Sequence, residues 1–189
     1  EKMEVYDSAI YLSRISLQLA MQIDWKRGIA VAYHNLGNAF LKSNKPDSAL
    51  YNYRMSVITA KQSGDFDVEL LNYGGLANAE VILQKSEQAM QWLLEGFNLI
   101  KNKPSVNNLF VNHFLDDASF IYKKYGQHNM LTMALEKKSE LLQKQIKSNN
   151  LQMNVILNAG LSNETRLLNL QVQQVKQQNE ISNTRVYLL

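Results

Sequence analysis

Three histidines and one adjacent pair of carboxylates carry the chemistry best suited to metal binding or proton transfer. The histidines are scattered along the chain, at His34, His113 and His128. Asp116 and Asp117 are neighbours, and neighbours on a helix point about 100° apart, which predicts a polar helix edge. The chain has no Cys, which excludes disulfides, thiol nucleophiles and Cys-based zinc sites. With no H-E-x-x-H, Walker A or G-x-S-x-G motif, the sequence predicts no catalysis, metal or cofactor.

Gly74 and Gly75 form a second unusual pair, inside a segment that otherwise reads as helix. Two interior glycines cost a helix about 2 kcal/mol relative to alanine, so they call for a reason. They lack the flanking strand and the glycine spacing of a phosphate-binding loop. One interpretation is a tight crossing against a neighbouring helix. The other is the floor of a groove that a ligand backbone approaches closely.

Composition favours long helices joined by short turns. Hydrophobic residues make up 46% and charged residues 20% of the 189 positions, which is enough apolar material for a core. The 2 prolines and 8 glycines leave few chain breaks, unlike a sandwich of many strands. A net charge of +3 is small for a nucleic-acid binder, so we expect no nucleic-acid partner. No apolar run approaches the ~20 residues of a membrane span.

Residues 30–61 contain two helical patterns separated by a break at Ser43-Asn44-Lys45-Pro46. Small and aromatic residues recur there as Tyr33-x2-Leu36-Gly37-x2-Phe40 and then Ala49-x3-Tyr53. This spacing resembles the tetratricopeptide repeat, whose small residues let two antiparallel helices approach closely. The resemblance implies an all-α superhelix of helix pairs. The closing Pro of the repeat is absent, so the second helix is expected to continue until Gly64-Asp65 ends it.

A 40-residue step extends this pattern along the chain. It relates Ala9, Ala49 and Ala89, and it also relates Tyr33 to Tyr73, Leu36 to Leu76 and Asn38 to Asn78. Residues 1–147 are therefore expected to form repeats, with an orphan second helix at 5–24 and helix pairs at 30–63, 67–101 and 107–147. Glu80 departs from the pattern, because it stands where an aromatic residue is expected. Residues 148–189 are expected to form a separate connecting helix.

In stacked helix pairs the first helices line the concave face, where a ligand binds. The positions there that the repeat pattern leaves free are Val31, His34, Asn38, Leu41, Leu71, Gly74, Asn78 and Val81. In peptide-binding members of the family, an Asn at the position of Asn38 and Asn78 grips the ligand backbone; otherwise both are exposed polar residues. Relatives that bind a C-terminal carboxylate use Lys, Arg and Asn. Here the third unit offers His113 and Asp117, which argues against such a clamp.

The C-terminal segment has a 4-3 ladder that is only partly apolar. A homodimer seam is predicted through Leu161, Leu168, Val172, Val175, Asn179 and Val186, with Asn179 as a polar layer that sets the register. The alternatives are a helix that lies across the repeats and a frayed tail.

The order of repeats, a Gln/Asn-rich helix and an apolar start at residues 186–189 resembles the extracytoplasmic sensor half of bacterial membrane-spanning regulators, notably those of Bacteroides-type bacteria. The resemblance implies a periplasmic module that binds a peptide or protein and precedes a membrane span just after Leu189. A histidine kinase or transcriptional output would then lie outside this chain. The alternative is a soluble adaptor, cytoplasmic and without a membrane link.

Overall fold

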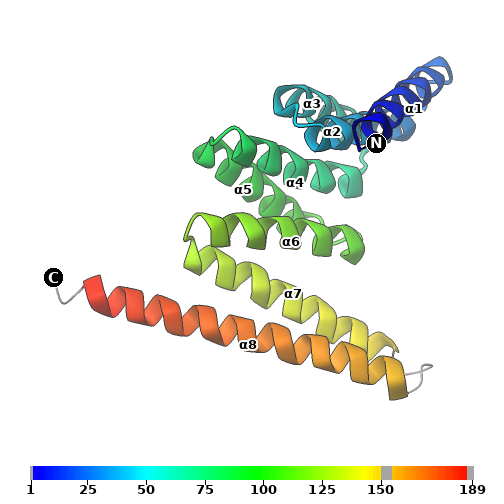
Figure 1. Cartoon of the computed structure of the whole chain (residues 1–189). Coiled ribbons are helices and arrows are strands. Elements are labelled where there is room, and N and C mark those ends of the chain that lie inside the picture. Colours follow the sequence, from blue (N-terminus) through cyan, green and yellow to red (C-terminus); the bar gives the residue numbers. More distant parts are fainter. Residues whose placement is uncertain (1, 150–154, 187–189) are drawn as a thin grey trace. The chain divides into compact units, whose positions relative to one another are not determined.

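The computed structural model describes the backbone of residues 2–149 and 155–186, and the side chains of residues 5–147 and 162–181. This described part consists of helices joined by short turns and contains no strand. The helices are α1 (Lys2–Gln22), α2 (Lys26–Lys42), α3 (Pro46–Ser63), α4 (Phe66–Ile82), α5 (Ser86–Asn102), α6 (Asn108–Lys124), α7 (His128–Asn149) and α8 (Val155–Val186) (Figure 1). The all-α class and the helical-repeat superhelix predicted from the sequence are confirmed.

The chain forms two compact units that divide inside α6. Unit 1 comprises Glu1–Asp117 and unit 2 comprises Ala118–Leu189. In unit 1 each of the helices α1 to α4 contacts the next helix along the chain, and α2 also contacts α4. Because α2 and α4 are the first helices of successive pairs, their contact places them beside each other on one face. The boundary that the repeat pattern places at residue 147, between the repeats and the C-terminal helix, is a different kind of division and stays a prediction.

The turns of unit 1 recur at regular intervals. Asp24, Asn44, Gly64 and Gln84 all have a left-handed backbone, with φ of 48°, 57°, 68° and 58°, and they lie 20 residues apart. A left-handed residue after the last helical turn lets the chain reverse direction. The predicted breaks at Ser43–Pro46 and at Gly64 are confirmed, since α2 ends at Lys42 and α3 ends at Ser63. The spacing therefore makes each half-repeat 20 residues long.

Close contacts at glycines hold the first and second helices together. A β-carbon on Gly37 of α2 would lie 2.5 Å from the ring of Tyr53 on α3, and one on Gly75 of α4 would lie 2.7 Å from the same ring. Ala49 and Tyr53 are both fully buried. The predicted role of Gly37 in close helix approach is confirmed. Gly75 fits both interpretations of the glycine pair, because it lies against the Tyr53 ring at a tight crossing and also lines a cavity.

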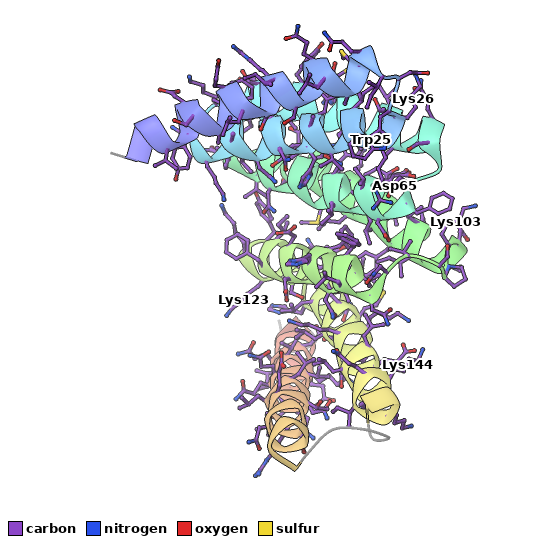
Figure 2. All side chains as sticks on the ribbon, turned by 90° about the vertical axis from the view of Figure 1, so that its right-hand side faces the viewer. Trp25, Lys26, Asp65, Lys103, Lys123 and Lys144 are labelled. Carbon is purple, nitrogen blue, oxygen red and sulfur yellow. The ribbon has the colours of Figure 1, made fainter. Side chains whose placement is uncertain are left out.

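One edge of unit 1 is fastened by contacts between successive turns. Figure 2 shows Trp25, Asp65 and Lys103 along this edge. Arg27 forms an ion pair with Asp65 at 3.2 Å, and the ammonium group of Lys103 lies 4.7 Å from the ring centre of Phe66. A hollow of about 380 Å³ lies beside these residues, and Arg27, Asp65 and Phe66 in its wall already take part in these contacts.

In unit 2, α8 lies alongside α7 of the same chain (Figure 1). Ser139 donates a hydrogen bond to Asn169 at 2.8 Å, and Lys176 forms an ion pair with Glu136 at 2.5 Å. Leu168 is 6% exposed. The helix therefore folds onto the last helix of the repeats, which is one of the arrangements that the sequence left open.

The residues of the predicted dimer seam differ in how deeply this arrangement buries them. Leu168 and Val172 are buried, Val175 and Asn179 are half-buried, and the side chains of Leu161 and Val186 lie outside the described residues. Asn179 also donates a hydrogen bond to Asn129 of α7. Self-association through α8 stays a prediction, and it would have to share a helix face that α7 already uses.

Candidate functional site

A cavity of about 410 Å³ opens on the face of unit 1 formed by the first helices. It is lined by residues of α2, α4 and α6 together with one residue of α3. These residues are His34, Asn38, Leu41, Tyr53, Leu71, Gly75, Asn78, Phe110, His113, Asp116 and Asp117. The volume falls within the usual range for small-ligand sites, which is roughly 300–1,000 Å³.

Five of the eight residues predicted for the concave face line this cavity, namely His34, Asn38, Leu41, Leu71 and Asn78. The other three do not. Val31 is 37% exposed but lies outside the lining, whereas Gly74 and Val81 are buried. The repeat pattern thus brought most of the predicted residues to one place, and their binding role stays a prediction.

A chain of hydrogen bonds runs from the cavity wall into the interior. The Tyr53 hydroxyl donates to Oδ1 of Asn38 at 2.7 Å, and the Asn38 amide nitrogen lies 2.9 Å from Nε2 of His34. Because the amide donates, Nε2 is the acceptor, so the proton of the neutral ring sits on Nδ1. Nδ1 lies 3.2 Å from Oδ1 of Asn72, which is fully buried. These bonds fix the orientation of both His34 and Asn38.

Asn72 carries the same network further into the core. Its amide nitrogen donates to Oγ of Ser56 and to the carbonyl oxygen of Val68, at 2.7 Å each. Ser56 in turn donates to the carbonyl oxygen of Ala30 at 2.6 Å. Each of these contacts satisfies a polar group that would be costly to bury alone. The polar wall of the cavity is therefore anchored on three helices, α2, α3 and α4.

Burial sets the protonation states in this network. It lowers the pKa of His34, against a smaller opposite effect of the hydrogen bond with Asn72. Burial also raises the pKa of Tyr53, and the nearby charge of Asp117 adds to that effect. At neutral pH, His34 is thus a neutral ring and Tyr53 a neutral phenol. Neither side chain brings charge to the cavity, and both ring nitrogens of His34 are already engaged, by Asn38 and Asn72.

Asp117 supplies a carboxylate on the α6 side. Asn78 donates a hydrogen bond to its Oδ1 at 2.8 Å, and its Oδ2 would lie 2.5 Å from a β-carbon on Gly74. Burial raises the pKa of Asp117, and the charge of Asp116 contributes, while Asn78 and His113 act in the opposite direction. Gly74 therefore serves this site by leaving room for Asp117, and it does not line the cavity.

Repeat spacing alone did not reveal the full contribution of α6. Phe110 and Asp116 were not predicted to line the cavity, and Asp116-Asp117 was interpreted as a polar helix edge. The signal in the sequence is a one-residue change of register between the second and third pairs. A step of 39 in place of 40 relates Leu71 to Phe110 and Asn78 to Asp117. With that step, α6 continues the rows of side chains begun on α2 and α4.

Comparison with known proteins adds no family to this picture: no protein-family model and no curated protein matches the sequence. Within the described residues, none of the helices combines the length and apolar character needed to cross a bilayer.

Proposed function

We propose that unit 1 is a non-catalytic binding module of the tetratricopeptide type, and that a peptide or protein ligand binds in the cavity between α2, α4 and α6. The observation that carries the proposal is that five residues chosen from the repeat pattern line one cavity. Its polar groups are fixed in place by buried partners, so a ligand would meet a prearranged surface. Such preorganisation reduces the free energy lost in ordering groups on binding.

Binding is tested by selecting random peptides displayed on phage against the purified chain. The cavity is filled in one variant by Leu71→Trp, because Leu71 is half-buried in its wall. A matched control is Leu94→Trp on α5, where the wild-type side chain is 53% exposed and outside the cavity. Selected peptides should bind wild type and the Leu94 variant but not the Leu71 variant. Equal binding to all three proteins would refute the cavity as the site.

The finer proposal is that this module is the extracytoplasmic sensor region of a membrane-anchored bacterial regulator, a histidine kinase or a transcriptional regulator. The support is the order of repeats, Gln/Asn-rich helix and apolar residues 186–189. α8 would then pass a change at the cavity toward the membrane. The gene sequence after Leu189 tests this, since a run of ~20 apolar residues is required.

A soluble adaptor is the second candidate. It is favoured by the burial of Leu168 and Val172 where α8 lies on α7, because a helix that covers the open side of a repeat acts as a cap. A stop codon or a polar continuation directly after Leu189 would support the adaptor and refute the membrane link. Both candidates use the same cavity, so the phage selection does not distinguish them.

A further inference from the structure

The polarity of the cavity is asymmetric. Its α2 side carries neutral groups, His34 and Asn38, whereas its α6 side carries the carboxylates of Asp116 and Asp117 together with His113. Among the described residues that line it, none is Lys or Arg. A ligand would therefore meet negative charge on one wall and hydrogen-bonding groups on the other.

Contacts with α4 fix the orientation of the Asp117 side chain. Asn78 donates to Oδ1 at 2.8 Å, while Oδ2 lies against the backbone at Gly74, where a β-carbon would come within 2.5 Å. The amide of Asn78 is neutral, so it orients the carboxylate without balancing its charge, and His113 on the same helix offsets only part of the effect of burial on the Asp117 pKa. Burial accordingly raises the pKa of Asp117, which means that the ionised form lacks the solvation it would have in water. A bound cation would supply the missing stabilisation.

The remaining lining is apolar and suits an aliphatic stem. Leu41 and Leu71 are half-buried in the wall, and the half-buried ring of Phe110 lies on the same helix as Asp117. Lysine and arginine bury their methylene groups against apolar surface while their charged ends reach polar partners. An aromatic ring adds a favourable interaction with a nearby cation.

We infer that the cavity binds a basic side chain, Lys or Arg, of its peptide or protein ligand, with the cationic group at Asp117 and the stem between Leu41, Leu71 and Phe110. This inference rests on the proposed function, because it specifies the ligand of the same cavity. In a carboxylate clamp, basic residues of the protein bind an acidic end of the ligand. Here the charges are exchanged, with an acidic residue of the protein and a basic group of the ligand. A ligand with an acidic end would be repelled by Asp117.

The test compares charge on both partners. Peptides from the phage selection are synthesised, and their affinities for the chain are measured by fluorescence polarisation. The variant Asp117→Asn keeps the size of the side chain and removes its charge. The control Glu87→Gln removes one negative charge at an exposed position of α5, outside the cavity. Circular dichroism melting curves establish that both variants are folded.

The expected result is that the selected peptides contain Lys or Arg and bind Asp117→Asn about tenfold more weakly or worse, as for a partly desolvated charge pair. Replacing the essential Lys or Arg of the peptide by norleucine should cause a similar loss. Glu87→Gln should change affinity by less than about twofold, as for a screened distant charge. Peptides that depend on the Leu71 site but bind Asp117→Asn unchanged would overturn this inference and leave the proposed function standing. Failure to select any cavity-dependent peptide would refute both.

Discussion

The ring of Tyr53 occupies the space that a side chain at Gly37 would need, since a β-carbon there would lie 2.5 Å from the ring carbon Cδ1. Gly75 meets the same ring from α4, where a β-carbon would lie 2.7 Å from Cζ. One aromatic side chain of α3 is thus enclosed by two glycines on neighbouring first helices. The hydroxyl of that ring then donates to Asn38 in the cavity wall. Repeat geometry and cavity geometry depend on the same contact.

We expect Gly37→Ala to lower the free energy of unfolding by about 1–3 kcal/mol, the usual loss when a methyl group is forced into a filled space. Alanine favours a helix by about 1 kcal/mol over glycine, so a mere propensity effect would have the opposite sign. Urea denaturation measures the change. In a Tyr53→Leu background the loss should shrink, because the obstructing ring is gone. The same loss in both backgrounds would show that the ring is not the cause.

Asn72 is the buried centre of the network behind the cavity. Asn72→Ala removes two donated hydrogen bonds and the partner of His34, so we expect a loss of about 1–3 kcal/mol in the free energy of unfolding. The matched control is Asn35→Ala on α2, where the side chain is exposed. Equal effects of the two substitutions in thermal or urea denaturation would contradict a structural role for the network.

Much of unit 1 could be predicted because its repeat residues are defined by local packing. The spacing of Gly37, Ala49 and Tyr53 specifies how closely two helices approach, and that information is carried in a short window. Glu80 shows the limit: it is only 2% exposed at a position where an aromatic was expected, with Arg54 of the preceding pair 3.6 Å away. The pairing depends on a contact between helices that no local pattern encodes.

The site was predicted less completely for a related reason. Asn38 and Asn78 were recognised by equal spacing, but Asp117 follows after 39 residues and is brought to Asn78 only by the way α6 packs. The position of a residue in the repeat also does not reveal whether its side of the helix faces the cavity. Gly74 has the repeat position of His34, yet Asp117 covers it. For α8, an apolar ladder specifies that a helix needs a partner without specifying which one.

His34 should make stability depend on pH. Burial lowers its pKa below the ordinary value of 6.5, so the unfolded chain takes up a proton before the folded protein does. The contribution of His34 is therefore fully present above about pH 6.5 and is lost as pH falls from there through the lowered pKa.

Urea denaturation between about pH 7.5 and about pH 5 covers the start of this window. The raised pKa of Asp117 has the opposite sign, because its carboxyl is protonated more readily in the folded protein, so Asp117→Asn serves as the background. Adding His34→Gln should flatten the decline toward acid. An unchanged slope after this substitution would assign the decline to other groups.

The last prediction concerns how α8 is held. Leu168 is 6% exposed on the helix that lies along α7, whereas its neighbour Leu167 is 62% exposed. Truncating a buried leucine to alanine usually costs about 2–5 kcal/mol, and truncating an exposed one costs far less. Leu168→Ala should therefore increase amide hydrogen exchange along α7 and α8 in the intact chain, while Leu167→Ala should leave it unchanged. If α8 instead served mainly as a dimer seam on its outer side, Leu167→Ala would be the more damaging change, and analytical ultracentrifugation would show a loss of dimer in that variant.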